Sequence, residues 1–434
     1  MSDRRLPQGW REAELGSVGA CFRGRGGTRA DEQADGLPCI RYGDLYTHHD
    51  CIVRSFCSAI SPTRAFAYTA LQSGDIVFAG SGETPEEIGR ATAYCDSSKA
   101  YAGGDTIIFR PGPGLVSRFV GYAVNSVAAN RYKSKMGQGS SVFHISSEHL
   151  SRLPLRFPSL PEEQHCVADV LQTVDAAIEH TSALIAKTQQ IKAGLMHDLF
   201  TRGVTPDGQL RPAREEAPKL YKESPLGWIP AEWTVRPLHE LADVNRGKFT
   251  IRPRNDARYY NGKYPFIQTG DVALAAGRVL TKYSQTLNEL GLCVSRLFPV
   301  GTIMVTIAAN IADTCILGTP MCAPDSLVGV VPNAGEVVRY LELCIRRRKR
   351  WLENRAPQTA QRNINLEDLR PLLIPYPERQ ERTRIAERYE AIDAPLREDE
   401  ENSANLRDFK RGLMHDLLTG RVRVPVPELR EVAI

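Results

Sequence analysis

The chain has 434 residues, of which 42% are hydrophobic and 24% are charged, and its formal net charge is +4. This composition can bury large cores and excludes a chain that is disordered throughout. A chain of this length is expected to form two to four domains. No apolar run approaches the roughly 18 to 20 residues that span a bilayer, and residues 1–7 lack the apolar core of a signal peptide. We therefore expect a cytoplasmic protein.

Short apolar runs separated by glycine and proline predict that the first half is a mixed domain of strands and helices. Strands are predicted at residues 75–78 and 106–109, a helix at about 116–127, and a Gly/Ser loop at 136–141. Pro161 and two acidic residues then predict the start of a long helix. Proline is favoured in the first turn, and acidic side chains stabilise the positive end of the helix dipole.

This long helix is predicted over residues 162–200, which is 39 residues or about 58 Å. Its inward residues are spaced alternately by four and three, which indicates a heptad seam rather than the face of a surface helix. The seam consists of Val167, Leu171, Val174, Ile178, Thr181, Ile185 and Thr188. A single helix cannot bury such a seam, so a partner helix is expected. Residues 203–224, which follow, have the composition of a linker.

The sequence of the second half predicts a similar order of elements. A strand is predicted at residues 300–308, a helix at 336–352 and a polar loop at 356–365, followed by a second long helix. Pro395 is expected to bend or split this helix, because proline removes a backbone hydrogen bond. The seam residues of the second helix are Ile385, Tyr389, Ile392, Leu396, Leu406, Phe409, Leu413 and Leu417.

The two halves are an internal repeat. The hexapeptide Gly-Leu-Met-His-Asp-Leu at residues 194–199 recurs at 412–417, an offset of 218 residues. We infer that the halves share one architecture and that the two long helices pack against each other. The alternative, that each helix packs only on its own domain, remains open. Other matched pairs are Trp10 and Trp233, Asp44 and Asp271, Ile76 and Ile303, Asp175 and Asp393, and Lys192 and Lys410.

No catalytic signature is present in the sequence. We find no phosphate-binding GxxxxGK[ST] loop, no GxSxG, no HExxH, and neither the Asn-Pro-Pro-Tyr motif of amino-methyltransferases nor the acidic motif of metal-dependent nucleases. The ten cysteines form no CxxC pair, and no histidine pair follows at zinc spacing. His48 and His49 are expected to lie in a polar loop. We therefore predict no catalytic residue, no metal site and no cofactor in this chain.

Basic residues cluster at corresponding places in both halves. In each half, one cluster lies in an early loop, and a second precedes a loop rich in amide and hydroxyl side chains. Residues 346–350 form such a run in the second half. Basic side chains neutralise phosphates, and arginine, glutamine and asparagine pair with base edges. An ordinary solvated surface is the alternative. The candidate DNA-binding residues are Arg23, Arg25, Thr28, Arg29, Arg41, Lys133, Lys135, Gln138, Ser140, Arg246, Lys248, Arg252, Arg254, Gln268, Gln358, Gln361, Arg362 and Asn363.

The run Gly-Leu-Met-His-Asp-Leu-Leu-Thr-Gly-Arg-Val-Arg-Val at residues 412–424 resembles the ending of the specificity subunits of type I restriction–modification enzymes. The resemblance extends over the whole chain, through the Pro-x-x-Trp openings, the Gly-Asp landmarks, the Gly26-Gly27-Thr28 loop and the entry into each long helix. The second half lacks a Gly-Gly-Thr loop.

The resemblance implies an α+β fold with two mixed α/β target recognition domains. They are related by a pseudo-two-fold repeat and separated by two long antiparallel, coiled-coil-like helices. The expected boundaries are target recognition domains at 1–158 and 225–375, a central spacer helix at 159–202, a linker at 203–224, a distal spacer helix at 376–420 and a tail at 421–434.

The resemblance also implies a non-catalytic subunit that reads a bipartite, asymmetric target in double-stranded DNA. Two modification (methyltransferase) subunits are expected to dock on its helices, together with two restriction (translocase/nuclease) subunits. S-adenosylmethionine, ATP and Mg are expected on those partners. A scaffold that binds only protein, or an enzyme whose site is not recognised, are the alternatives. Salt dependence separates the first alternative from DNA binding, because phosphate contacts make affinity fall steeply with salt.

Overall fold

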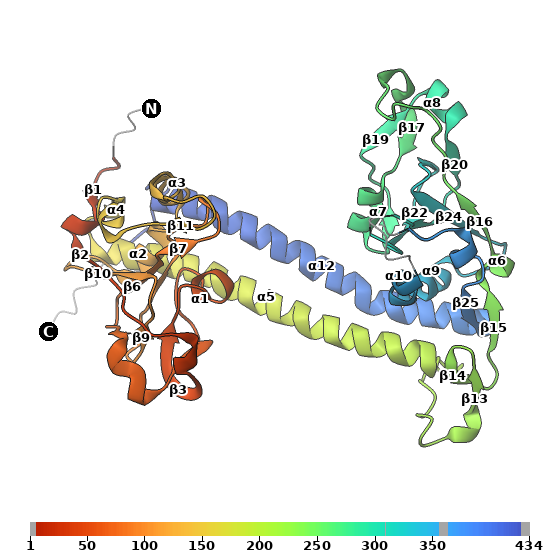
Figure 1. The fold of residues 1–434 in the computed structure, drawn as a ribbon, viewed down its shortest axis with the longest axis horizontal. Helices are drawn as coiled ribbons and strands as arrows, with labels where there is room; N and C mark the ends of the chain where they lie inside the picture. The colour runs from red at the N-terminus through yellow and green to blue at the C-terminus, as the bar shows by residue number, and fades with distance from the viewer. Residues whose placement is uncertain (1–5, 309, 356–362, 427–434) are drawn as a thin grey trace. The chain divides into compact units, whose positions relative to one another are not determined.

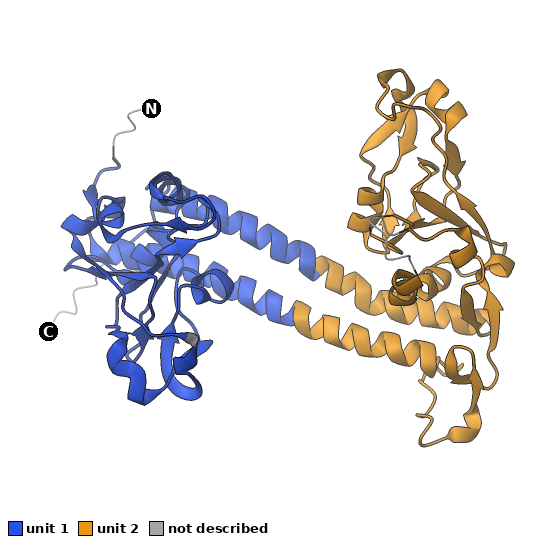
Figure 2. Cartoon of the chain, in the orientation of Figure 1, with its two compact units in different colours: residues 1–184, 399–434 blue, residues 185–398 orange. Residues whose placement is uncertain are grey.

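The computed structural model describes residues 6–308, 310–355 and 363–426. The chain forms two compact units, one made of Met1–Leu184 and Asp399–Ile434 and the other of Ile185–Glu398 (Figure 2). Two long helices, α5 (Pro161–Thr201) and α12 (Arg379–Leu418), contribute residues to both units (Figure 1). The first of them extends one residue beyond the predicted range at each end.

Two four-stranded sheets form the framework of the first unit. One has the order β2-β10-β6-β8, with every neighbouring pair antiparallel. The other has the order β4-β3-β9-β5, in which β3 and β9 are parallel. The strands are β2 (Gly19–Arg23), β3 (Glu32–Ile40), β4 (Ser58–Ile60), β5 (Thr69–Ala70), β6 (Ile76–Ala79), β8 (Ala91–Ala93), β9 (Tyr101–Ala102) and β10 (Thr106–Pro111).

The second unit repeats this framework. Its sheets have the orders β16-β24-β21-β22-β18 and β19-β17-β23-β20, again with one parallel pair, β17 and β23, inside the second sheet. The strands are β16 (Ala242–Arg246), β17 (Tyr260–Phe266), β18 (Val279–Leu280), β19 (Gln285–Leu287), β20 (Arg296–Phe298), β21 (Ile303–Thr306), β22 (Thr314–Leu317), β23 (Met321–Ala323) and β24 (Leu327–Pro332). β18, which is parallel to β22, is an additional strand at the edge of the first of these sheets. The other strands match those of the first unit in order and pairing sense, which confirms the internal repeat.

A two-stranded sheet brings the start of each half beside the strand that precedes its long helix. In the first unit β1 (Trp10–Glu14) pairs with β12 (Pro154–Pro158). In the second, β15 (Thr234–Pro237) pairs with β25 (Leu373–Tyr376). The remaining pairs are β7 (Ser81–Gly82) with β11 (Phe143–His144), and β13 (Tyr221–Ser224) with β14 (Gly227–Pro230).

Short helices occupy matching positions in the two units. The predicted helix at 116–127 is α2 followed by a break, and Ser126 caps the next helix, α3. The predicted helix at 336–352 is likewise divided, at Arg348, into α9 and α10. The short helices are α1 (Asp44–Thr47), α2 (Ser117–Ala123), α3 (Val127–Met136), α4 (Ser147–Ser151), α6 (Leu238–Leu241), α7 (Thr269–Ala275), α8 (Glu289–Val294), α9 (Val338–Arg347), α10 (Lys349–Arg355) and α11 (Leu366–Leu369).

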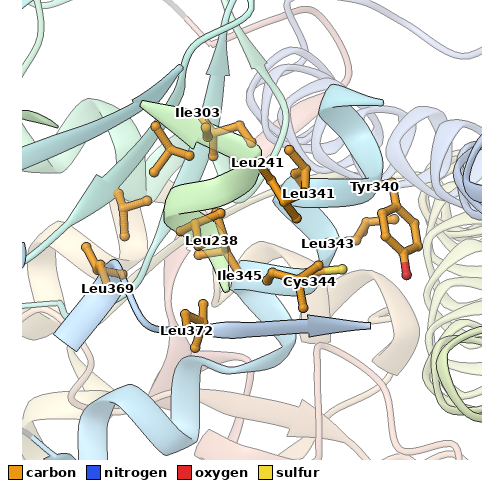
Figure 3. Close-up of a cluster of buried hydrophobic side chains, with 14 of the residues drawn as sticks. Leu238, Leu241, Ile303, Tyr340, Leu341, Leu343, Cys344, Ile345, Leu369 and Leu372 are labelled. Carbon is orange, nitrogen blue, oxygen red and sulfur yellow. The ribbon is translucent and has the colours of Figure 1, made fainter. Parts of the chain in front are cut away.

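The largest buried cluster of the second unit joins one sheet to the helices that cover it. Ile303 of β21 packs with Leu238 and Leu241 of α6 and with Leu341 and Ile345 of α9 (Figure 3). The same cluster includes Leu199, Phe200 and Ile385 from the long helices. Apolar burial therefore anchors the ends of both long helices in this unit.

The two long helices pack against each other as antiparallel partners, as predicted. In the first unit Lys410 of α12 forms an ion pair of 2.6 Å with Asp175 of α5. In the second unit Lys192 of α5 pairs with Asp393 of α12. These residues are the matched pairs of the sequence repeat, so each ion pair joins a residue of one copy to a residue of the other. Tyr122 also donates a hydrogen bond of 2.6 Å to Asp175.

Two predictions about the second helix are corrected by the structure. α12 is not split and continues through Pro395. Pro395 and Ala391, whose carbonyl loses its hydrogen bond, both lie on the exposed side, where that carbonyl is accessible to solvent. Phe409 is not part of the seam and is 58% exposed. The inward position at that turn belongs to Lys410, which is held by Asp175.

Within the part of the chain that the structure describes, no helix has both the length and the apolar character needed to cross a membrane.

Candidate nucleic-acid interface

Two of the predicted clusters of the first unit meet at one pocket. The pocket has a volume of about 320 Å³, and both Arg23 and Gln138 line it. Arg23 lies at the end of β2; its side chain is 77% exposed, and its guanidinium lies 3.4 Å from Asp105. An ion pair so exposed contributes little, so the guanidinium is available to a ligand. Gln138 is placed by its backbone, which exchanges two hydrogen bonds with His144. The pocket therefore combines an exposed cation with an amide.

The glycines around Arg23 and Arg25 allow the loop to pack closely against the chain. A Cβ at Gly24 would lie 2.2 Å from the Thr106 hydroxyl oxygen, and one at Gly26 would lie 2.2 Å from the Gly104 nitrogen. The glycines are thus required because the loop packs against the chain's own atoms.

The other predicted residues of the first unit differ in their exposure. Arg25, Thr28, Lys135 and Ser140 are exposed, and Arg25 and Lys135 form no ion pair with any residue that the structure describes. The side chain of Arg29 lies outside the described part. Arg41 is only 19% exposed and contacts Glu32 at 3.3 Å, so most of its guanidinium is inaccessible. The exposed residues, rather than Arg41, remain candidates for phosphate contacts.

Lys133 was predicted to contact DNA, and this prediction is wrong. Its side chain is fully buried, and its Nζ donates a hydrogen bond of 2.6 Å to the carbonyl of Gly89. Burial lowers the pKa of Lys133 to about 7, from an ordinary value of 10.5. The helix α3 turns this residue inward while leaving Lys135 outside, because positions two apart face different sides of a helix.

A pH dependence follows from the buried position of Lys133. Between about pH 7 and 10.5 the unfolded chain binds the lysine proton and the folded chain does not. Stability therefore rises with pH across this window, by up to about 1.4 kcal/mol per unit. In urea unfolding, wild type is expected to gain stability relative to Lys133→Met from pH 7 to pH 10. A constant difference between the two proteins would contradict the buried, neutral lysine.

The second unit has a larger pocket, of about 660 Å³, lined by residues of β17 and β19. It lies at the other sheet of the repeated framework, since the pocket of the first unit is lined from β2 and β10. Arg254 and Gln268, both predicted, line the pocket of the second unit. Gln268 precedes α7, and its backbone N–H donates to Asp271 at 2.7 Å. Its amide also donates to Gln285 at 3.1 Å. Paired amides of this kind present both donors and acceptors, which is what base edges require.

Asp325 offsets part of the basic cluster in the second unit. Its carboxylate lies 2.7 Å from Arg254 and 3.6 Å from Arg252. Its backbone carbonyl accepts a hydrogen bond from Arg246. Lys248 is exposed and has no ion pair among the residues that the structure describes. The positive charge at this loop is therefore smaller than the sequence suggested, and Asp325 holds two arginines in defined positions.

The basic run at 346–350 has a structural role at its first two positions. Arg346 donates a hydrogen bond of 2.8 Å to the Tyr389 hydroxyl and contacts Glu342 at 3.1 Å. Arg347 lies over the Phe200 ring. These arginines attach α9 to the long helices. Asn363 is exposed and bridges to Ala308, whereas Gln358, Gln361 and Arg362 lie outside the described residues.

Sequence reasoning missed several residues that complete the two pockets. Asn255, Tyr283 and Gln285 line the pocket of the second unit, and His144 and Ser147 line that of the first. Gln285 reaches the pocket because β19 pairs with β17, opposite Phe266. No local pattern marks these residues. The exception is Asn255, which could have been suspected because it directly follows Arg254, a predicted residue, in the sequence.

The chain is similar to known proteins along its full length. The profile of a family described as the type I restriction modification DNA specificity domain matches residues 230–405. Two similar proteins come from Methanocaldococcus jannaschii. The MjaX type I restriction enzyme specificity subunit is 24% identical over 433 residues, 96% of this chain and 95% of its own length. The MjaVIII type I restriction enzyme specificity subunit is 25% identical over 296 residues, 66% of each chain.

Solved structures show the same fold. The S subunit of a type I restriction–modification system from M. genitalium superposes with a TM-score of 0.63 at 14% identity, covering 95% of this chain and 98% of that one. A chain from a study of the assembly and conformational transition of the type I R-M system has a TM-score of 0.52 at 16% identity, covering 96% and 100%. At such low identity these likenesses concern the fold.

Proposed function

Because this chain belongs to the family of specificity subunits of type I restriction–modification enzymes, we propose that it reads a bipartite, asymmetric DNA target, one half with each unit. Members of this family are non-catalytic DNA-recognition subunits, which agrees with the sequence-based prediction that the chain is not an enzyme. We propose that the protein acts in the cytoplasm, because its proposed target is DNA.

One observation supports the bipartite target above all others. The two units share strand order and pairing sense, yet their polar pockets contain different side chains. Arg23, Gln138 and His144 line the first pocket, whereas Arg254 and Gln268 line the second. The pockets also lie at different sheets of the shared framework, at β2 and β10 in the first unit and at β17 and β19 in the second. Unequal donors and acceptors at unequal places favour different base pairs. Two different half-sites are the expected consequence.

We propose that two modification subunits dock on the long helices, at the repeated hexapeptide. Residues 194–199 and 412–417 have the same order of exposed, half-buried and buried positions. Met196 and Met414 are half-buried in both copies, and His197 and His415 are exposed. A surface that occurs twice in one chain fits two copies of one partner. Two restriction subunits, with ATP and Mg, and S-adenosylmethionine on the modification subunits complete the proposed complex.

The test uses the full chain assembled with its modification partner and a library of randomised DNA duplexes. The selected sequences are expected to share two short conserved segments separated by an unconserved gap. Affinity is also expected to fall steeply with salt, because bound phosphates release counterions. A single contiguous site would contradict the two-unit proposal. Salt-independent association without sequence selection would favour a protein-only scaffold.

A further inference from the structure

Three side chains of the first unit come together with the ligand chemistry of a zinc site. One ligand atom each of Asp44, His49 and Cys57 lies within 4.8 Å of the other two. Asp44 begins α1, His49 follows the end of that helix, and Cys57 directly precedes β4. A carboxylate, an imidazole and a thiol are the three ligand types that proteins use for Zn²⁺. The cluster lies apart from the pocket lined by Arg23 and Gln138, whose lining includes none of the three.

The imidazole of His49 is the observation that points to a ligand. The residue is only 3% exposed, and its Nε2 atom is buried without a hydrogen-bond partner in the described structure. Leaving a buried polar atom unpaired costs about 1–3 kcal/mol. The ring itself is held by edge contacts with His48, at 5.0 Å between centroids, and Phe56, at 6.4 Å. A bound cation would satisfy the lone pair that the fold leaves unused.

The carboxylate of Asp44 is already oriented by its surroundings. It accepts hydrogen bonds from the Arg41 backbone N–H, at 2.9 Å, and from the Ser58 hydroxyl, at 3.1 Å. The two bonds go to different oxygens, so each oxygen keeps a lone pair. Metal-binding carboxylates are commonly fixed by outer hydrogen bonds of this kind. Cys57 is a free, exposed cysteine, which gives an ion a path from solvent.

The second unit contains the same carboxylate without the other two ligands. Asp271 of α7 accepts hydrogen bonds from the Gln268 backbone, at 2.7 Å, and from Ser284, at 2.8 Å. Asp271 thus repeats the capping arrangement of Asp44. Ala276 stands five residues after this aspartate, where the first unit has His49, and Tyr283 stands before Ser284, where the first unit has Cys57. The histidine and the cysteine are therefore specific to the first unit, and capping alone does not require them.

We propose that the first unit binds one Zn²⁺ ion through the Asp44 carboxylate, the His49 imidazole and the Cys57 sulfur, with water in the fourth position. Binding forms the zinc–sulfur bond and releases the thiol proton to solvent. Tetrahedral zinc places its ligand atoms roughly 3.5 Å apart, so the three side chains need to close by about 1 Å. The ion would tie α1 to the segment before β4. This inference does not depend on the proposed DNA target.

The test is a titration of the chelator-treated full chain with CoCl₂, followed by absorption spectroscopy. One equivalent of Co²⁺ is expected to produce a thiolate-to-cobalt charge-transfer band and the visible bands of tetrahedral cobalt. ZnCl₂ is expected to remove both. Absence of the charge-transfer band would overturn the proposal, as would a stoichiometry of two, because the second unit lacks the histidine and the cysteine.

Variants assign the ligands. Cys57→Ser is expected to abolish the charge-transfer band and to weaken Co²⁺ binding at least about tenfold. Because Cys57 is exposed, the Cys57→Ser variant is expected to fold normally, and circular dichroism checks this. Cys293→Ser removes another exposed cysteine, in the second unit, and is expected to leave the spectrum unchanged. His49→Gln is expected to weaken binding while keeping a sulfur–cobalt band. A band that survives in Cys57→Ser, or that disappears in Cys293→Ser, would overturn the assignment.

Discussion

Replacing Glu381 with alanine is expected to destabilise the second unit by about 3–5 kcal/mol. Glu381 lies in the first turn of α12, and its carboxylate accepts hydrogen bonds from Arg211 at 3.1 Å, Trp233 at 3.1 Å and the Val204 backbone at 2.8 Å. The side chains of Arg211 and Glu381 are only 7% and 6% exposed. The substitution removes a carboxylate that neutralises the buried Arg211 guanidinium. It also leaves the buried N–H groups of Trp233 and Val204 without their acceptor.

The first unit provides a comparison, because it repeats the contacts with a tryptophan and an arginine but not the contact with a backbone N–H. Glu163, in the first turn of α5, accepts hydrogen bonds from Trp10 at 3.3 Å and from Arg423 at 2.6 Å and 2.7 Å. Here the arginine side chain is 46% exposed. Water can solvate Arg423 when the carboxylate is removed, so Glu163→Ala is expected to cost less, about 1–3 kcal/mol.

The measurement is urea unfolding of the full chain, with hydrogen exchange used to monitor each unit separately. Exchange resolves the units separately, which matters because a chain with two units need not unfold in one step. Glu381→Gln keeps an acceptor for Trp233 and is expected to lie between wild type and Glu381→Ala. Equal destabilisation by Glu163→Ala and Glu381→Ala would show that burial of the arginine does not determine how much unfolding free energy each substitution costs.

Removing the basic side chains of one unit is expected to weaken reading of one half-site only. The double substitution Arg23→Ala and Arg25→Ala removes exposed cations of the first unit, and Lys248→Ala with Arg254→Ala does so in the second. Removing an arginine that binds a base costs about 1–3 kcal/mol. The first double variant loses two arginines and is expected to bind roughly 30-fold or more weakly, whereas the second loses one arginine and is expected to bind roughly fivefold or more weakly. The salt slope is expected to fall by about one for each phosphate that the variant no longer binds.

Binding of the assembled complex to duplexes in which one half-site is scrambled tests this assignment. The weakening caused by the first-unit variant should disappear when its own half-site is scrambled and persist when the other is scrambled. Lys219→Ala with Lys222→Ala removes two exposed charges outside the pocket of the second unit and serves as the charge-matched control. Equal weakening by the two basic double variants at the same half-site would contradict one unit reading each half.

Features that depend on local pattern or on repetition were predictable from the sequence. The heptad spacing predicted α5 to within one residue at each end, because helix periodicity is local. The offset of 218 residues predicted two copies of one framework, which the strand orders confirm. The matched pairs Asp175–Asp393 and Lys192–Lys410 were also visible, although nothing local indicated that each aspartate pairs with the lysine of the other copy.

The duplicated architecture and the paired helices can be inferred from the amino-acid sequence, because periodicity and repetition are properties of residue spacing. Which polar residues face solvent, and which charges compensate each other, is known only once the chain is folded. Lys133 is buried, Asp325 offsets the arginines of the second unit, and Arg211 and Arg423 complete the contacts of Glu381 and Glu163. These outcomes depend on contacts between residues far apart in the chain, which local residue patterns do not encode.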